Sequence, residues 1–95
     1  MIVCFQVEIA DGDKVEAAFC VARADTLNEP GCISFDLNRH PRHPGRYVVY
    51  ERWRSLADLD AHLRTTYISL LRDQLNEWIV GDPDFQVLVP AGAWV

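Results

Sequence analysis

His62 is the side chain of this sequence best suited to proton transfer. It follows Leu56 and Leu59 and precedes Leu63, three leucines that form one stripe of an expected helix. Because each helical residue turns by about 100°, the histidine lies on the flank of that stripe, where it can point into the gap between helix and sheet. An imidazole has a pKa of about 6.5 and can accept a proton at neutral pH, so we predict a general base. The alternative is a half-buried histidine that bonds to a backbone carbonyl.

Glu51 and Trp53 share one face of an expected strand at residues 46–53, and Tyr50 lies on the other face. This strand is apolar or aromatic on both faces, which is typical of a central strand. An unpaired charge is costly to bury, so Glu51 needs a partner or a raised pKa. It could orient a base or mark the floor of a pocket, but we favour a hydrogen bond across a dimer interface. Tyr50 and Trp53 could line an aromatic pocket, although such residues more often form core.

The histidines and cysteines elsewhere in the chain form no metal-binding pattern. His40 and His43, in the stretch HPRHP, have no third ligand nearby, whereas zinc needs three or four ligands in fixed geometry. The three cysteines, Cys4, Cys20 and Cys32, are odd in number and show no CxxC spacing, so no disulfide framework is indicated. We therefore expect a solvated loop around the two histidines and no bound metal.

The length and charge of the chain limit its possible functions. Its 95 residues suffice for a single domain, residues 1–95, with a thin core, and its 49% hydrophobic residues are typical of a globular protein. A net charge of -5 argues against nucleic acid, which is bound through clustered Lys and Arg. No apolar run reaches the ~18 residues of a membrane span, and no signal peptide precedes the first strand. We expect a cytoplasmic protein with no nucleic-acid or membrane partner.

Two helix starts are marked by capping-box spacing, in which paired side chains satisfy free backbone amides. Asp13 with Glu16 marks the first start, and Ser55 with Asp58 marks the second. Apolar alternation marks the strands, and prolines and glycines mark the turns between elements. The expected elements are strands at residues 2–9, 32–38, 46–53 and 84–90, and helices at about residues 13–27, 55–64 and 66–80.

The order strand, helix, strand, strand, helix pair, strand predicts a split βαβ or ferredoxin-like fold of the α+β class, with helices on one face of an antiparallel sheet. In the second strand, Ile33, Phe35 and Leu37 should share one face. The helix-free face of the sheet cannot be purely solvated, because the third strand is apolar on both sides. We therefore predict a symmetric homodimer with its two sheets face to face, and we expect Trp94 in the apolar tail to dock on a protein surface.

The stretch EPGCISFDLNRHPRHPGRYVVYERWRSLADLDAHL resembles the antibiotic biosynthesis monooxygenase family. Members of that family carry an EPG turn, here residues 29–31, and a polar loop with proline before the third strand, here residues 40–45. They also carry an E-x-W pair, here Glu51 and Trp53, and a helix with the pattern LxAH, here residues 59–62. The likeness extends from the first strand to the VLVP stretch. The combined pattern is specific for the family but not for one reaction.

The resemblance implies a dimeric α/β barrel made from two ferredoxin-like sheets, and oxygenation of phenols, anthrones or quinols without flavin, haem or metal. In such a site His62 would be the base or would position a water. Tyr50, Trp53 and Phe35 would stack on the substrate rings, beside Glu51. Tyr50 and Trp53 face opposite ways, however, so both cannot line the pocket of one chain unless a bulge intervenes. Haem-degrading relatives place a ligand histidine on the last helix, where this sequence has none.

We expect a cofactor-independent monooxygenase that acts on a quinol, an anthrone or a polyphenolic small molecule with molecular oxygen. An electron-rich phenolate can itself pass an electron to oxygen, so the protein need only deprotonate the substrate and hold it in a dry aromatic pocket. Two alternatives stay open, because a fold does not determine a reaction. One is a non-catalytic ligand-binding or dimeric interaction module, and the other is a cofactor-free isomerase of a small metabolite that uses the same histidine.

Overall fold

The structure, a computed structural model, describes residues 1–91, so the predicted docking of Trp94 lies outside the described residues. Within residues 1–91 the chain forms one four-stranded antiparallel sheet and a set of helices that lie on one face of it. The elements in chain order are β1 (Ile2–Gln6), the short 3-10 helix η1 (Ile9–Asp11), α1 (Gly12–Thr26), β2 (Cys32–Arg39), β3 (Arg46–Trp53), α2 (Leu56–Leu63), α3 (Thr66–Trp78) and β4 (Asp84–Gln86).

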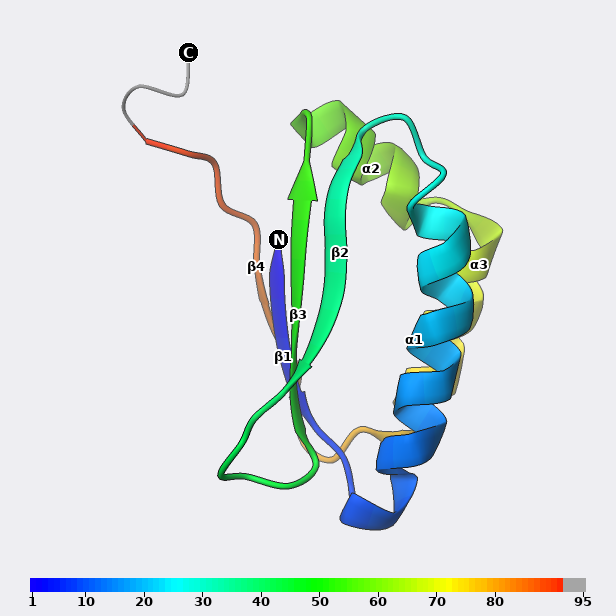
Figure 1. Cartoon of the computed structure of the whole chain (residues 1–95), viewed down its shortest axis with the longest axis vertical. Helices are drawn as coiled ribbons and strands as arrows, with labels where there is room; N and C mark the ends of the chain where they lie inside the picture. The colour runs from blue at the N-terminus through cyan, green and yellow to red at the C-terminus, as the bar shows by residue number, and fades with distance from the viewer. Residues whose placement is uncertain (92–95) are drawn as a thin grey trace.

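The strand order across the sheet is β2-β3-β1-β4, so β3 is a central strand, as its two-sided apolar pattern predicted. Figure 1 shows α1 and α3 packed along one side of the sheet, with α2 at one end. This is the expected α+β, ferredoxin-like arrangement. No helix of the described residues is both long enough and apolar enough to cross a membrane.

The core lies between the sheet and the two long helices. The alternation predicted for the first strand buries Val3 and Phe5, and the spacing of three and four in α3 buries Leu71 and Leu75. Each large apolar side chain contributes about 1.5–3 kcal/mol when it is fully buried. The buried apolar side chains are Val3, Phe5, Val7, Val15, Phe19, Ala22, Phe35, Tyr47, Val49, Leu59, Ile68, Leu71 and Leu75.

One of the two predicted helix starts is confirmed. The backbone N–H of Asp58 donates to the Ser55 hydroxyl at 3.1 Å and caps α2, which is half of the expected pairing. The carboxylate of Asp58 accepts from the Ser55 hydroxyl and from Arg54 instead of from a backbone amide. The capping box of Asp13 and Glu16 is wrong, because the carboxylate of Glu16 binds Tyr47 at 2.7 Å instead of a backbone amide. A partner brought in by the tertiary fold takes precedence here over a local pairing.

A register shift in β2 decides which side chains face the helices. Cys32 lies opposite Trp53 and Phe35 lies opposite Glu51, so β2 has one more residue than β3 between these two pairs. The extra residue bends the strand and breaks its alternation. Ile33 is therefore 56% exposed, and the prediction that it shares a face with Phe35 is wrong.

The fourth strand is shorter than predicted. It spans residues 84–86 instead of 84–90. Its pairing partner is β1, and the pairing extends from Asp84 opposite Cys4 to Gln86 opposite Ile2. The apolar residues 87–89 are more than half exposed in the single chain.

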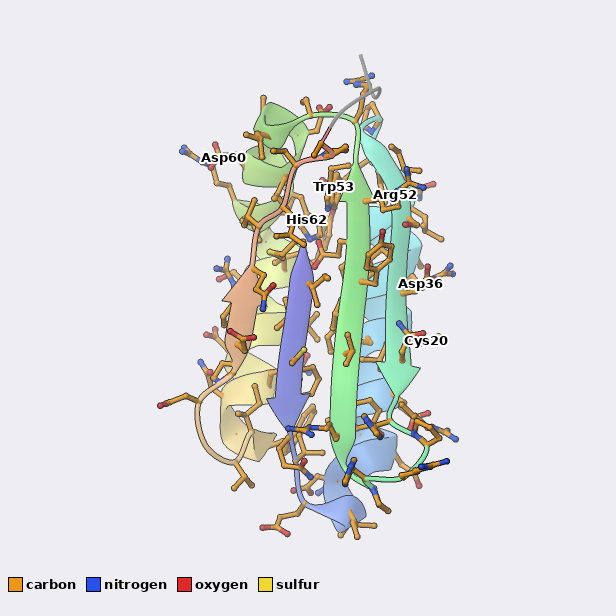
Figure 2. The ribbon with its side chains drawn as sticks, turned by 90° about the vertical axis from the view of Figure 1, so that its left-hand side faces the viewer. Cys20, Asp36, Arg52, Trp53, Asp60 and His62 are labelled. Carbon is orange, nitrogen blue, oxygen red and sulfur yellow. The ribbon has the colours of Figure 1, made fainter. Side chains whose placement is uncertain are left out.

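The face of the sheet without helices carries a mixture of apolar and charged side chains. Figure 2 looks onto this face. Cys4 and Val48 are half-buried at its centre, and Tyr50 is 44% exposed beside them. Arg52 lies on the same face nearer the end of β3.

Candidate functional site

His62 is almost completely buried, at 1% exposure, between α2 and the sheet. The predicted leucine stripe is only partly correct, because Leu56 is 58% exposed while Leu59 is buried. The side of α2 that meets the protein is therefore formed by Leu59 and His62. The histidine lies at the centre of this buried side and not on its flank.

Both nitrogens of the imidazole face carboxyl groups. Nδ1 lies 2.8 Å from Oε2 of Glu29, and Nε2 lies 3.5 Å from Oε1 of Glu51. A carboxylate can only accept a hydrogen bond, so the Nδ1–H of a neutral imidazole donates to Glu29. The lone pair is then on Nε2, which makes Nε2 the atom that can accept a proton.

Glu29 comes from the turn between α1 and β2, far from His62 in the sequence. Its Oε2 also accepts a hydrogen bond from the hydroxyl of Tyr67 on α3. Burial, together with this hydrogen bond to Glu29, raises the pKa of Tyr67 to about 12, so the tyrosine keeps its proton and remains a donor. The Nδ1–H of His62 on α2 and the hydroxyl of Tyr67 on α3 thus both donate to the carboxylate of Glu29 and hold it in place.

The sequence indicated Glu29 only as part of the EPG turn and indicated no role for Tyr67. No local pattern joins a turn residue to a histidine 33 positions later. The available signal was the resemblance itself, which included both the EPG turn and the LxAH helix.

Glu51 is a buried carboxyl group on the helix side of β3, with 4% exposure. Burial raises its pKa, although the hydrogen bond from the indole N–H of Trp53, 3.1 Å long, works in the opposite direction. Glu51 therefore keeps its proton up to a higher pH than an ordinary glutamate does. The side chain points away from the open face of the sheet and accepts from Trp53 of the same chain, and the hydrogen bond across a dimer interface that we favoured stays a prediction.

Of the three predicted aromatic residues, two contact His62 and only one lines the pocket. Phe35 and Trp53 both pack on the imidazole, with ring centroids 5.5 Å and 4.4 Å from that of His62. Phe35 lines the pocket described below, whereas Trp53 lies outside its lining. Tyr50 is on the opposite face of the sheet, so it cannot reach this pocket in its own chain, as the alternation implied.

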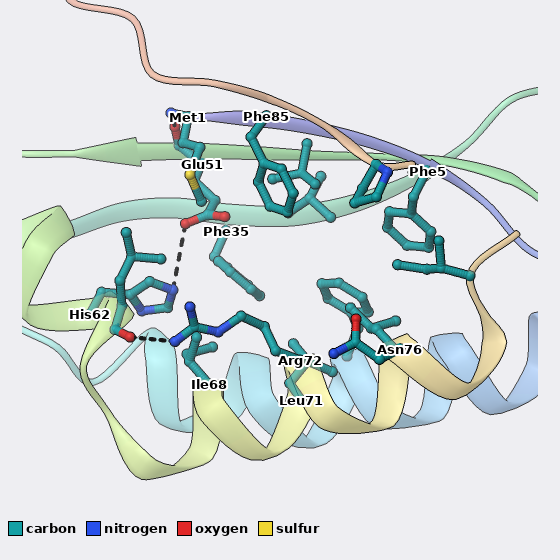
Figure 3. A pocket seen from close by; sticks show the side chains of 17 residues that line it. Met1, Phe5, Phe35, Glu51, His62, Ile68, Leu71, Arg72, Asn76 and Phe85 are labelled. Carbon is teal, nitrogen blue, oxygen red and sulfur yellow. Dashed lines mark hydrogen bonds and ion pairs between the residues drawn. The ribbon is translucent and has the colours of Figure 1, made fainter. Parts of the chain in front are cut away.

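A pocket of about 210 Å³ opens beside His62, between the sheet and α3 (Figure 3). His62 and Glu51 lie at one end of it in Figure 3, and Arg72 and Asn76 project from α3. The remaining lining is apolar: Met1, Val3, Phe5, Phe19, Phe35, Val49, Leu63, Ile68, Leu71, Leu75, Ile79, Pro83 and Phe85. A small apolar ligand could therefore place one polar atom near the proton-accepting nitrogen.

The histidines of the β2–β3 loop are remote from this pocket. The rings of His40 and His43 lie 4.5 Å apart, in contact with each other. In the part of the chain that the structure describes, no group of three or more His, Cys, Asp or Glu side chains is placed to hold a metal ion.

The fold and the site together define a class: a ferredoxin-like α+β domain with a buried histidine at one end of an apolar pocket. A sequence model described as antibiotic biosynthesis monooxygenase matches residues 1–74 of the chain. The chain belongs to this family, as the EPG turn, the E-x-W pair and the LxAH helix indicated.

Known proteins share the fold over almost the full chain. The structure of Rv0793 from Mycobacterium tuberculosis matches with a TM-score of 0.87 and 26% identity, covering 99% of this chain and 95% of that one. A candidate antibiotic biosynthesis monooxygenase from Nitrosomonas europaea matches with a TM-score of 0.82 and 24% identity, covering 93% and 96%. The Synechocystis protein sll1783 is 32% identical over 57 residues, which are 60% of this chain and 34% of that protein. The chain thus spans about a third of the length of this curated relative.

Proposed function

We propose that the protein is a cofactor-independent monooxygenase that oxidises an electron-rich phenol of the quinol type with molecular oxygen, and that His62 is its general base. The observation that carries this proposal is the orientation of the imidazole. Glu29 binds Nδ1 at 2.8 Å, and Nε2, which has only the Glu51 carboxyl group at 3.5 Å, lies at one end of a mainly apolar pocket.

The residues of the pocket meet the two requirements of such a reaction, a base and a water-free site. A phenol becomes a strong electron donor to oxygen only as a phenolate, so the first requirement is a base within reach of the hydroxyl. Nε2 of His62 supplies it, and the carboxylate of Glu29 stabilises the imidazolium that forms. The second requirement is a dry site that protects the reactive intermediate from water, which the aromatic and aliphatic lining supplies.

The overall reaction balances without any added reductant. A quinol and one molecule of oxygen give a hydroxyquinone and one molecule of water, so the substrate supplies all four electrons. One oxygen atom enters the ring and the other leaves as water. The proton taken up by His62 returns to the reduced oxygen in the later steps.

Glu51 would serve as a second proton carrier. Its oxygen lies 3.5 Å from Nε2, which is longer than a well-formed hydrogen bond and leaves this nitrogen open to a substrate. Because burial raises its pKa, the carboxyl group holds a proton up to a higher pH than an ordinary glutamate and would release that proton to the product. A charged Glu51 would instead stabilise protonated His62.

A second candidate, a cofactor-free isomerase, is favoured by the same pair. Two proton carriers at one end of a pocket can remove a proton from one atom of a substrate and return it to another without using oxygen. Turnover of a substrate under anaerobic conditions would distinguish this reaction from oxygenation.

The homodimer is also part of the proposal. The open face of the sheet exposes apolar surface at Val48 and Tyr50, and residues 87–89 add further exposed apolar side chains beyond β4. A second copy placed face to face would cover this surface, as in a dimeric α/β barrel. The protein would carry out its reaction in the cytoplasm.

Oxygen consumption by the purified, metal-stripped protein tests the reaction. We would supply benzoquinols, naphthoquinols and anthrones and compare wild type with His62→Gln, using His43→Gln as a matched control from the exposed loop. The proposal expects uptake in the wild type and the control, loss of uptake in His62→Gln, and hydroxylated quinone as the product. Absence of uptake with every substrate, from protein that is folded, would favour a binding module or an isomerase.

A further inference from the structure

We propose that the substrate carries an anionic group, most simply a carboxylate, and that Arg72 binds it. The substrate class is then a hydroxylated aromatic acid of one or two fused rings. This inference deepens the proposed function, because it names the substrate of the same pocket.

Arg72 lines the pocket together with Glu51, His62 and Asn76, and no other lysine or arginine in the described part of the chain is among the lining residues. Nη2 of Arg72 donates to the backbone oxygen of Leu63 at 2.6 Å (Figure 3). A guanidinium has five N–H donors in a rigid fork, so most of its donors remain available to a ligand. Within residues 1–91, no carboxylate lies in ion-pair distance of Arg72, unlike Arg23, Arg54 and Arg64. The described arginines Arg42, Arg46 and Arg52 also lack such a partner, but they do not line the pocket.

The bond to Leu63 also fixes where the guanidinium lies. Leu63 ends α2, one residue after His62, and its carbonyl belongs to the last helical turn, whose oxygens have no partner within the helix. The side chain of Arg72 is therefore anchored beside the proton-accepting residue before a ligand arrives. Because less freedom is lost on binding, an anchored arginine favours a ligand more than a free one does.

The polar groups His62, Glu51 and Arg72 gather at one end of the pocket, and Figure 3 shows the guanidinium of Arg72 beside His62. Glu51 lies beside His62, and when ionised it repels a carboxylate placed there. A planar acid would therefore direct its carboxylate to Arg72, where two parallel N–H···O bonds can form. Because Arg72 lies beside His62, a hydroxyl close to that carboxylate would face Nε2 of His62.

The pocket volume limits the number of rings. A protein cavity of roughly 150 Å³ holds benzene. At about 210 Å³, this pocket has room for one ring with its substituents or for two fused rings. A three-ring anthrone would extend through the mouth, so we infer that quinols and hydroxynaphthalenes fit better than anthrones.

Titration calorimetry with three naphthalene probes tests the inference without any turnover. The probes are 1-naphthol and two hydroxynaphthoates, one with the carboxylate next to the hydroxyl and one with it across the ring. The proteins are wild type, Arg72→Gln and Arg64→Gln, the last being a matched control that removes an exposed arginine outside the pocket. Thermal unfolding would verify that each variant folds.

The wild type should bind at least one hydroxynaphthoate about tenfold more tightly than 1-naphthol, as one partly exposed charge-assisted pair provides. Arg72→Gln should lose this preference and bind 1-naphthol as before, and Arg64→Gln should behave like wild type. In 0.5 M salt the wild-type preference should shrink, because salt screens an exposed charge.

Three results would overturn the inference. They are equal binding of naphthol and naphthoates by wild type, an unchanged preference in Arg72→Gln, and an equal weakening of all probes in Arg72→Gln. The last would mean that Arg72 only stabilises the end of α2. If Arg72→Gln does not fold, Arg72→Lys replaces it, and its preference should fall below that of wild type because the fork is lost.

The outcomes separate this inference from the proposed function. Carboxylate-selective binding without oxygen uptake would support the assignment of Arg72 and reject the oxygenase. Oxygen uptake that is no more efficient with a carboxylated quinol than with its uncharged counterpart, in wild type and in Arg72→Gln alike, would support the oxygenase and reject the acidic substrate.

Discussion

Replacement of Glu29 by Gln should lower the turnover number without weakening substrate binding. Glutamine keeps the shape of the side chain, and its oxygen can still accept from Nδ1 of His62 and from Tyr67. What the variant loses is the negative charge 2.8 Å from the imidazole. This charge stabilises the imidazolium that forms when His62 takes the substrate proton.

The size of the effect follows from that one interaction. A hydrogen bond to a charged group contributes about 1.5–3 kcal/mol, and 1.36 kcal/mol corresponds to a factor of ten in rate. The carboxylate of Glu29 is only 17% exposed, so solvent screens it little. We therefore expect kcat to fall about ten- to hundredfold. KM should change little, because Glu29 does not line the pocket.

The assay is steady-state oxygen uptake with the best quinol substrate, analysed separately for kcat and KM. Tyr67→Phe removes a hydrogen-bond donor to Glu29 but leaves its charge, so kcat should fall less than in Glu29→Gln. Glu77→Gln removes an exposed carboxylate of α3 and serves as the control for net charge. A folded Glu29→Gln variant with the wild-type kcat would refute the assignment of Glu29 as the residue that positions and charges the base.

Two further predictions concern Glu51 and the dimer. Burial raises the pKa of Glu51 in the folded protein above its ordinary value of 4.5. The folded protein therefore keeps the carboxyl proton at pH values where the unfolded chain has released it. As the pH rises above about 4.5, the folded protein loses stability relative to the unfolded chain. Glu51→Gln should therefore gain stability relative to wild type as the pH rises above about 4.5, by at most about 1.4 kcal/mol per pH unit. Urea unfolding that shows the same difference between the two proteins at pH 4.5 and at pH 7 would contradict this. Tyr50→Asp places a charge on the open face of the sheet and should raise the dimer dissociation constant more than about a hundredfold in sedimentation experiments, because an unpaired buried charge is costly. Val21→Asp, at a valine of α1 that is 71% exposed, should leave the dimer unchanged, and an equal effect of both variants would count against a dimer through the open face.

Local patterns in the sequence were sufficient to predict the order of the elements. The alternation of Val3 and Phe5, the spacing of Leu71 and Leu75, and the cap at Ser55 all depend on neighbours a few residues away. The errors arose where a distant partner decides the outcome. Tyr47 takes Glu16 away from its predicted capping role, for example.

The candidate site was only partly predictable for the same reason. The prediction that His62 is a base came from its residue type. The prediction that it lies on a helix came from the periodicity of the neighbouring leucines. The two carboxyl partners of His62 lie on a turn and on a strand, and only the tertiary fold brings Glu29 and Glu51 to the two sides of the ring. The register shift in β2, which sets Phe35 opposite Glu51, has no signature that alternation alone could detect.

The most direct test of the central claim is the rate of oxygen consumption by the metal-stripped protein with a quinol, in wild type and in His62→Gln. The account predicts uptake by wild type and a loss of at least about a hundredfold in the variant, which corresponds to the removal of a general base. His62→Gln must remain folded for this comparison, and thermal unfolding establishes that. Equal uptake in both proteins would contradict the claim that Nε2 of His62 removes the substrate proton.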